Sequence, residues 1–312
     1  MFSRRSLLLS PLAFETAFLK PPRASKFIDS AGRKVQLPDS IKRILPAGPP
    51  AEVLLDSLVP EKSVRLVGPW TDIQKLLDIE AIHSLHVDLI VDYGAIDERY
   101  AAFANKVQTE TGIPYLLLDG RLAKVPEIIR RLGSIVRKDG RAKDIAKTAE
   151  RALQKLAPIM LKPVRERISV YYARGSDGLR AVRAGSSLEE AIVLAGGRNV
   201  VLPGEETFSV MSANDVAMLK PSVVILAKPT AAKPGAPLRQ ALPAETLFLV
   251  DPGLQYGWVE RPPSLNRLRG ALWLASHLYP KEISYSADDA RTMNVARFDR
   301  FPTDPTINEM IR

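Results

Sequence analysis

The chain contains no cysteine and, among its 312 residues, only three histidines: His83, His86 and His277. The lack of cysteine excludes disulfides, thiolate metal sites, iron–sulfur clusters and cysteine nucleophiles. With so few histidines, a metal site made of histidine alone is not expected. Long apolar runs are absent too, because the best internal candidate, residues 270–280, has about half of the roughly 18–20 residues that a membrane-spanning helix needs. We therefore expect a mature chain that does not span a membrane.

Hydrophobic residues make up 46% of the chain and charged residues 25%, which is typical of a globular protein with two domains or one large two-lobed core. The net charge is +9, and the whole excess lies in residues 121–167, which hold fourteen basic and five acidic side chains. This segment has apolar residues at helical spacing and no aromatic residue. We therefore interpret its charges as the solvated face of a helix, with nucleic-acid binding as the less favoured alternative.

The N-terminal sequence is similar to a bacterial export signal. Residues 3–8 read SRRSLL and precede a short apolar stretch, as in the twin-arginine type of signal. Glu15 interrupts this stretch, and no clean A-x-A cleavage motif follows. We expect residues 1–25 to be a signal-like segment and the protein to be periplasmic, exported by the twin-arginine route. A cytosolic protein with a frayed N-terminus is the alternative.

From residue 26 onward, short β-branched or aliphatic runs alternate with amphipathic stretches, a pattern typical of α/β proteins with parallel sheets. Strands are expected at residues 43–45, 64–67, 89–91, 115–118, 168–172, 223–226 and 247–250. Helices are expected at residues 51–58, 73–77, 125–137 and 188–194.

Residues 140–161 separate these strands into two groups and carry apolar side chains at helical spacing. A helix of this length spans about 25–30 Å, roughly the size of one small lobe. The sequence also has a weak internal repeat, because residues 79–91 and 213–225 share the pattern of a short helix, a turn and a buried strand. We therefore predict two Rossmann-like α/β lobes with parallel sheets, at residues 26–139 and 163–312, joined by a single long helix at 140–162.

Several further stretches follow one another in a recognisable order. They are IDSAGRKVQLP at residues 28–38, DLI at 88–90, AGGRNV at 195–200, PSVVI at 221–225, PPSLNRL at 262–268, WLA at 273–275 and LYP at 278–280. Together they resemble the ABC-transporter periplasmic substrate-binding proteins of the cobalamin and ferric-siderophore family, the class III proteins whose lobes are joined by one helix. Val87 departs from the pattern, since that family usually has proline at this position.

The resemblance implies an extracytoplasmic component of an ABC importer, without enzymatic activity and without a cofactor or metal of its own. Such a protein captures a small ligand between its lobes and delivers it to an ABC permease in the inner membrane. The leading ligand is a ferric siderophore or a similar metal chelate, and cobalamin, haem and molybdate or tungstate are the alternatives. We expect a monomer, because the binding cycle needs a free cleft and a free docking face.

Ligands of parallel α/β sheets bind outside the carboxyl ends of the strands, so we expect the loops at these ends to line a cleft between the lobes. Tyrosine, tryptophan and arginine in such loops suit a negatively charged chelate or an oxyanion. Tyr171 and Tyr172 alternate along one strand, so only one of them is expected to be accessible. The candidate ligand-binding residues are Trp70, Tyr93, Tyr172, Arg174, Lys228, Tyr256, Trp258 and Arg261.

Members of this family commonly place one acidic residue on each lobe, where it pairs with an arginine of the permease. The internal repeat carries the first position to Glu80 and the second to Asn214, which Asp215 follows. The resemblance therefore implies permease docking through Glu80 and, in place of Asn214, through Asp215.

An α/β enzyme is the remaining alternative. The sequence has no G-x-G-x-x-G after a strand, no P-loop motif and no G-x-S-x-G elbow. No histidine falls in an expected cleft loop, so a catalytic base is not apparent. Glu205 and Glu206 are adjacent in a loop, and their positions give no argument for acid–base chemistry. We therefore favour binding over catalysis.

Overall fold

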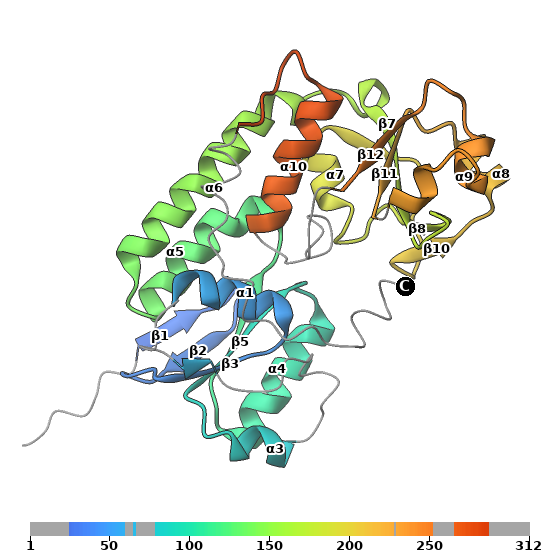
Figure 1. The fold of residues 1–312 in the computed structure, drawn as a ribbon. Helices are drawn as coiled ribbons and strands as arrows, with labels where there is room; N and C mark the ends of the chain where they lie inside the picture. The colour runs from blue at the N-terminus through green and yellow to red at the C-terminus, as the bar shows by residue number, and fades with distance from the viewer. Residues whose placement is uncertain (1–24, 60–64, 67–78, 228, 252–264, 287–312) are drawn as a thin grey trace, which may run out of the picture.

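The structure is a computed structural model, and it describes residues 25–59, 65–66, 79–227, 229–251 and 265–286. Helices and strands carry the labels of Figure 1. The chain forms two α/β lobes, each built on its own sheet, and the long helix α6 (Asp139–Met160) leads from the first lobe to the second. The predicted fold class, two Rossmann-like lobes with parallel sheets joined by a single long helix, is confirmed.

The first lobe has a four-stranded parallel sheet in the order β4-β3-β5-β6. Leu89 and Val91 of β5 pack on the face covered by α1 and α5, whereas Ile90 packs on the face covered by α3 and α4. Because both faces are buried, the strands read as continuous apolar runs. The elements are β3 (Arg43–Pro46), α1 (Pro49–Leu58), β4 (Arg65–Leu66), α3 (Ile79–Ser84), β5 (Leu89–Gly94), α4 (Glu98–Thr111), β6 (Tyr115–Asp119), the 3-10 turn η1 (Leu122–Lys124) and α5 (Val125–Ile135).

An antiparallel hairpin of β1 (Ser25–Ile28) and β2 (Lys34–Leu37) precedes the parallel strands. Asp29 fixes its turn, because its carboxylate accepts hydrogen bonds from the N–H groups of Ala31 at 3.0 Å and Arg33 at 2.9 Å. The same carboxylate accepts from the N–H of Leu117 in β6 at 3.2 Å. One buried aspartate thus fastens the hairpin to the first sheet.

Helix α6 is amphipathic. Its apolar side, which includes Ala142, Ile145 and Leu156, is buried against α5 and α10, and its charged side faces solvent. Gly133 of α5 permits a close approach, since a Cβ at this position would lie 2.1 Å from the Cβ of Ala142. Pro158 lies within the last turns, and the helix continues past it to Met160. The helix predicted at residues 140–161 is therefore present with nearly the same bounds.

The second lobe has a six-stranded sheet in the order β10-β8-β7-β11-β12, with β9 also pairing with β7. Strands β9, β7, β11 and β12 are parallel, and β8 and β10 run antiparallel to their neighbours. The elements are the 3-10 turn η2 (Val164–Glu166), β7 (Ile168–Arg174), β8 (Arg180–Val182), α7 (Glu190–Leu194), β9 (Gly197–Asn199), β10 (Phe208–Val210), α8 (Ala213–Leu219), β11 (Val223–Leu226), the 3-10 turn η3 (Pro229–Ala232), α9 (Pro237–Ala241), β12 (Leu247–Val250) and α10 (Leu265–Leu278).

The two lobes repeat one arrangement. The parallel order β4-β3-β5-β6 in the first lobe has the same chain order as β9-β7-β11-β12 in the second. The repeated segments form α3 and β5 in one lobe and α8 and β11 in the other. His86 and Lys220 occupy matching positions of these segments, and both have a left-handed backbone, with φ values of 47° and 48°. The internal repeat read from the sequence is thus a repeat of structure.

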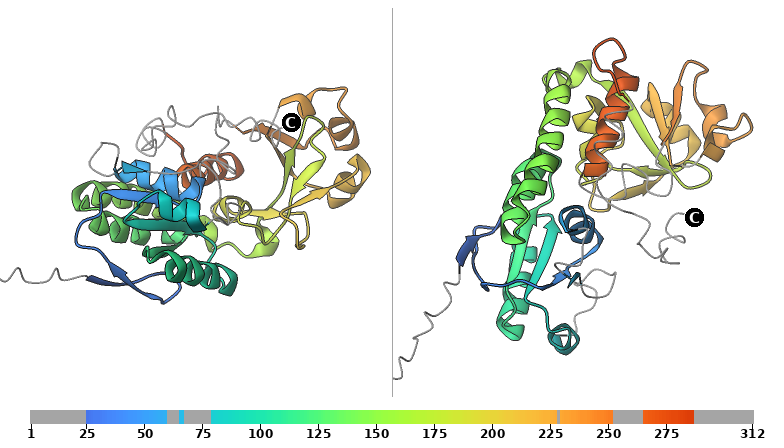
Figure 2. Two further views of the ribbon diagram at one scale, coloured as in Figure 1. Left: turned by 90° about the horizontal axis from the view of Figure 1, so that it is seen from below. Right: turned by 60° about the vertical axis from the view of Figure 1, so that its left-hand side comes forward.

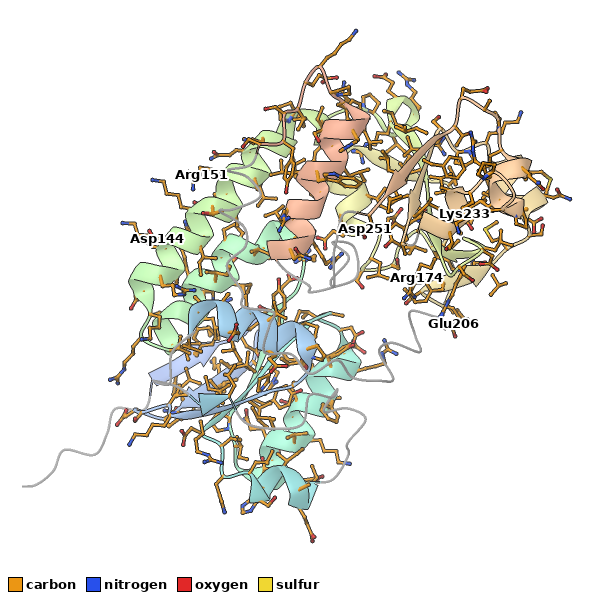
Figure 3. All side chains as sticks on the ribbon, in the orientation of Figure 1. Asp144, Arg151, Arg174, Glu206, Lys233 and Asp251 are labelled. Carbon is orange, nitrogen blue, oxygen red and sulfur yellow. The ribbon has the colours of Figure 1, made fainter. Side chains whose placement is uncertain are left out.

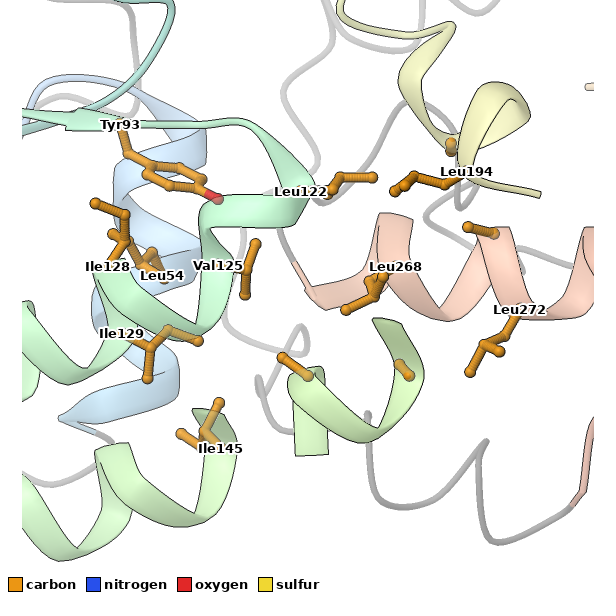
Figure 4. Packing of buried hydrophobic residues seen from close by; sticks show 14 of the residues in the cluster. Leu54, Tyr93, Leu122, Val125, Ile128, Ile129, Ile145, Leu194, Leu268 and Leu272 are labelled. Atoms are coloured by element: carbon orange, nitrogen blue, oxygen red, sulfur yellow. The ribbon is translucent and has the colours of Figure 1, made fainter. Parts of the chain in front are cut away.

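The lobes also touch directly beside α6. Leu122, which follows β6 in the first lobe, belongs to the same buried cluster as Leu194 of α7 and Leu268 of α10 in the second. Figure 4 shows these three side chains together with Val125, at the point where the lobes meet. Figure 2 shows from two further directions that α10 lies alongside α6. One continuous apolar core therefore joins both lobes to the connecting helix.

Candidate functional site

Each lobe turns the carboxyl ends of its parallel strands toward the other lobe (Figure 1). In the first lobe, β6 leads into η1, which contacts α10 of the second lobe. In the second lobe, Arg174 ends β7 and Asp251 follows β12, and Figure 3 shows both on the side of the lobe nearest the first. In open parallel sheets, ligands bind at the carboxyl ends where the strand order reverses. That switch point lies between β3 and β5 in the first sheet and between β7 and β11 in the second.

Four residues stand side by side along the carboxyl edge of the second sheet. Arg180 of β8 is paired directly with Arg174 of β7. Ala227 comes next, because its N–H donates to the carbonyl of Ala173, and Asp251 follows, because its N–H donates to the carbonyl of Leu226. Side chains on one strand alternate between faces, so Arg174 lies on the same face as the buried Tyr172 two residues earlier. The edge therefore has two guanidinium groups at one end and a carboxylate at the other.

Aromatic rings hold these charged groups in place. The guanidinium carbons of Arg174 and Arg180 lie 4.4 Å and 4.5 Å from the centre of the Phe208 ring. At the other end, the hydroxyl of Tyr172 donates to Oδ2 of Asp251 at 3.3 Å. Arg174 and Asp251 are both buried, whereas Arg180 is exposed. Cations over ring faces gain electrostatic stabilisation, so the Phe208 ring helps to fix the positions of both guanidinium groups.

The edge of the first sheet is less polar. Tyr93 is the last buried residue of β5, and 2% of its surface is exposed. Its ring packs beside Leu54 and Ile128 (Figure 4). On the opposite face, Asp92 accepts a hydrogen bond from the hydroxyl of the buried Tyr115 at 2.9 Å. The Tyr93 ring is thus part of the core, and Asp92 is the carboxylate that this strand places at the edge.

Glu52 lies in the first turn of α1, directly after the carboxyl end of β3, and its side chain is buried. Burial raises its pKa from 4.5 to about 8, and the nearby Asp56 carboxylate acts in the same direction. A carboxyl group in this position is therefore protonated at neutral pH and can donate a hydrogen bond. Among the described residues near the switch point of the first sheet, Glu52 has the largest shift in pKa.

A polar bridge connects the lobes behind the two edges. Oε1 of Glu190 in α7 accepts a hydrogen bond from the N–H of Leu122 at 2.6 Å, and its Oε2 lies 3.7 Å from Nη2 of Arg267 in α10. Arg267 is 5% exposed and also donates to the carbonyl of Ser187. Burial raises the pKa of Glu190 and lowers the pKa of Arg267. The bridge fixes where the second lobe meets the start of η1.

The predicted ligand-binding residues divide into three groups. Arg174 lies at the switch point of the second sheet. Tyr93 and Tyr172 are buried in the core, and Tyr171 is buried as well, because helices cover both faces of the second sheet; the expectation that one of the two adjacent tyrosines is accessible is therefore wrong. The other five candidates lie outside the described residues: Trp70, Lys228, Tyr256, Trp258 and Arg261.

The two predicted docking residues are both exposed and lie on different lobes, Glu80 on α3 and Asp215 on α8. Asp215 also has a structural role. It forms a capping box with Ser212, whose N–H and O–H donate to Oδ2 at 3.0 Å and 2.7 Å. These hydrogen bonds hold the pKa of Asp215 below its usual range.

The basic segment makes many contacts within the chain. Arg130 pairs with Glu150, and Lys124 and Arg131 pair with Glu127. Other members of the segment donate to backbone carbonyls, and these are Arg131 to Ile28, Arg137 to Asp39, Arg141 to Ser57 and Arg167 to Lys162. Several basic side chains of the segment thus have partners within the chain, and the pair of Arg130 with Glu150 joins α5 to α6. These contacts favour the interpretation as a helix face over nucleic-acid binding.

Within the described ranges, no group of three or more histidine, aspartate or glutamate side chains is placed to hold a metal ion. His83 and His86 are exposed, and His277 is exposed on α10 with Nδ1 2.9 Å from the carbonyl oxygen of Trp273. None of the helices in the part of the chain that the structure describes has the length and apolar character needed to cross a bilayer.

Sequence reasoning missed several residues of this region: Arg180, Phe208, Asp251, Glu190 and Arg267. Arg180 and Phe208 lie on strands of three residues each, which periodicity cannot detect. Asp251 could have been found, since it directly follows an expected strand and therefore lies at a carboxyl end. The contact between Glu190 and Arg267 depends on the docking of α7 and α10, which no local pattern reveals.

No protein-family model and no curated protein matches the sequence. Solved structures do match. An ABC transporter solute-binding protein from Sulfurospirillum deleyianum is 24% identical, with a TM-score of 0.72 over 91% of this chain and 98% of its own. A periplasmic solute-binding protein from Veillonella parvula is 16% identical, with a TM-score of 0.68 over 92% and 96%.

A third similar structure is the molybdate-bound periplasmic binding protein of Haemophilus influenzae. It is 17% identical, with a TM-score of 0.59 over 83% of this chain and 92% of its own. Identities this low establish the fold and leave the ligand open. The chain has the fold of the class III ABC-transporter solute-binding proteins, the family that its sequence resembles.

Proposed function

We propose that this protein is the extracytoplasmic substrate-binding component of an ABC importer. It captures a small anionic metal chelate between its lobes, with a ferric siderophore as the leading candidate, and releases it unchanged to a permease in the inner membrane. The observation that carries the proposal is the position of Arg174. Its guanidinium stands at the switch point of the second sheet, on the side nearest the first lobe (Figure 3).

The arrangement of the lobes supports capture without chemical conversion. The apolar core around Leu122, Leu194 and Leu268 and the bridge through Glu190 hold the two carboxyl edges at a fixed separation. A preformed site of this kind binds with little rearrangement. In this proposal, residues 26–139 and 163–312 are the lobes, residues 140–162 are the connecting segment, and residues 1–25 direct export to the periplasm by the twin-arginine route.

A molybdate or tungstate oxyanion is the second candidate ligand. The direct pairing of Arg174 with Arg180 favours it, because two adjacent guanidinium groups can share the oxygens of one small anion. One of the similar structures is a molybdate-binding protein. Cobalamin and haem are further possibilities on this fold, since other similar structures are a vitamin B12-binding protein and haem-binding proteins.

Delivery would use the exposed carboxylates at the outer ends of the lobes. Glu80 on α3 is free of the capping role that Asp215 has on α8, so we propose Glu80 as the stronger contact with a permease arginine. Glu80→Lys should lower transport by the cognate importer while leaving ligand affinity unchanged. Asp215→Asn should lower both transport and the thermal stability of the protein, because it weakens the capping box.

A thermal-shift panel tests the proposal, with ferric siderophores, haem, cobalamin, molybdate and nickel chelates run beside a DNA retention assay. A ligand that binds the native state alone raises the melting temperature by mass action. We expect one panel compound to raise it for the wild type and for Lys143→Gln, a change on the exposed face of α6, and to raise it less for Arg174→Gln. Salt-sensitive DNA retention without any thermal shift would overturn the proposal.

A further inference from the structure

We propose that the exposed face of α6, together with the turn that follows this helix, binds a membrane surface rich in anionic phospholipid. The surface is separate from the carboxyl edge of the second sheet. Figure 3 shows Arg151 on the outer side of α6, away from Arg174 and Asp251. Lipid binding on this side would therefore leave that edge open.

Four basic side chains form a row along the exposed face of α6. Lys143, Lys147, Arg151 and Lys155 recur at every fourth position, and all four are exposed. The row is about 18 Å long. Like charges at this spacing face one another and destabilise a helix. The row therefore presents a line of positive charge that an anionic partner can neutralise.

The charges of the row have little compensation within the chain. Among the described residues, Lys143, Lys147 and Arg151 form no ion pair. Arg151 donates to the hydroxyl of Thr148 at 3.3 Å, which is a neutral acceptor. Glu150 lies beside the row, but its carboxylate is 2.8 Å from Nη2 of Arg130 in α5. The exposed carboxylate of Asp144 thus faces four basic groups.

An exposed apolar turn adjoins the end of the row. Leu161 and Val164 are 85% and 60% exposed. Leu161 keeps a helical backbone and lies about five turns after Lys143, so it is on the same side of the helix. Arg167 fastens the turn, because its Nε donates to the carbonyl of Lys162 at 3.1 Å. The two apolar side chains therefore belong to a turn that is held in place.

The combination of charge and apolar side chains selects the partner. Anionic headgroups attract basic side chains, and the boundary with the acyl chains accepts apolar ones. A nucleic acid would neutralise the row, but it offers no apolar phase to Leu161 and Val164. Residues 121–167 also hold no aromatic side chain on which a base could stack. An anionic lipid surface accounts for both features.

The experiment is sedimentation of the full chain with vesicles of phosphatidylglycerol and phosphatidylcholine in equal parts, and with vesicles of phosphatidylcholine alone. We expect the wild type to bind the anionic vesicles at least about tenfold more tightly, and salt to weaken this binding. Lys147→Gln/Arg151→Gln should weaken it by about twenty-fivefold, since each basic residue near an anionic surface contributes about fivefold. Leu161→Ser/Val164→Ser should weaken it by at least about fivefold.

Matched controls exist for both variants. Lys106→Gln/Lys233→Gln removes the same net charge from exposed positions outside α6. Leu202→Ser/Val210→Ser removes two apolar side chains that are 74% and 86% exposed elsewhere in the second lobe. Neither control should change vesicle binding. All variants keep residues 1–25, so any lipid binding by that segment is the same in each of them.

Three results would overturn the proposal, and each leaves ligand capture untouched. Equal losses in Lys147→Gln/Arg151→Gln and in its control would assign the binding to net charge alone. Unchanged binding in both α6 variants would assign it to another part of the chain. Retention on duplex DNA that falls in Lys147→Gln/Arg151→Gln, with vesicle binding unchanged, would identify the row as a nucleic-acid contact.

Discussion

Removing the carboxylate of Glu190 is the change that most directly loosens the contact between the lobes. Its Oε1 accepts from the Leu122 N–H at 2.6 Å, and its Oε2 lies 3.7 Å from Nη2 of Arg267. In a Glu190→Leu variant, the guanidinium of Arg267 stays buried and keeps the carbonyl of Ser187, but it loses its carboxylate. The Leu122 N–H loses its acceptor in the same step.

The size of the effect follows from the burial of the pair. Breaking a buried ion pair from one side costs about 3–5 kcal/mol. The side chain of Glu190 is 26% exposed, so water can partly replace it, and we expect the low end, about 3 kcal/mol. Burial raises the pKa of Glu190 and lowers that of Arg267. The loss of hydration thus destabilises the two charges by more than their mutual attraction stabilises them. Replacing both, in Glu190→Leu/Arg267→Met, should therefore restore stability to within about 1 kcal/mol of the wild type.

Urea unfolding followed by the fluorescence of the three tryptophans measures these differences. The control is Glu110→Leu on the exposed face of α4, which should change the free energy of unfolding by less than about 0.5 kcal/mol. The single variant Arg267→Met completes the comparison. If the loss of unfolding free energy in Glu190→Leu/Arg267→Met equals the sum of the losses in Glu190→Leu and Arg267→Met, the two side chains do not interact. That result would refute the reasoning about the bridge.

Two further predictions concern Glu52 and Gly196. The pKa of Glu52 is raised, so the native state retains a proton that the unfolded chain releases, and stability falls as the pH rises from about 4.5 to about 8. Glu52→Gln should raise the melting temperature at pH 8 but not at pH 4.5. If the melting temperatures of variant and wild type change with pH in parallel, this prediction is contradicted. Gly196→Ala should lower the free energy of unfolding by about 3 kcal/mol, because φ is +75° and the new Cβ would lie 2.1 Å from Cγ2 of Ile159. The control is Gly140→Ala, where the new Cβ meets open space and the free energy of unfolding should not fall.

Much of the fold could be predicted because its signals are local. All seven expected strands have a counterpart in the structure, although only part of the one predicted at residues 64–67 lies in the described ranges. The helix predicted at residues 73–77 lies outside them. The connecting helix was visible because its apolar residues recur over many turns. Strands β8, β9 and β10 were not predicted, since three residues are too few to establish a period.

The candidate site was less predictable because it depends on register. Arg174 could be singled out because it ends an expected strand. Its pairing with Arg180 and the stacking of both on Phe208 follow from strand pairings that no sequence pattern specifies. Tyr172 alternates with Tyr171 as expected, but alternation does not say whether a face is open, and here helices cover both faces. The carboxyl edge of the second sheet, with Arg174 at the end of β7, could therefore be predicted from the sequence. The residues next to Arg174 follow only from the strand pairing in the structure.

Hydrogen–deuterium exchange tests the central claim most directly, with the panel compound that gives the largest thermal shift as the ligand. Binding should slow exchange in both lobes at once, at the carboxyl end of β5 around Gly94 and at that of β7 around Gly175. The middle of α6 around Ala149 should be unaffected. Protection confined to one lobe, or found along the exposed side of α6, would contradict capture between the two edges.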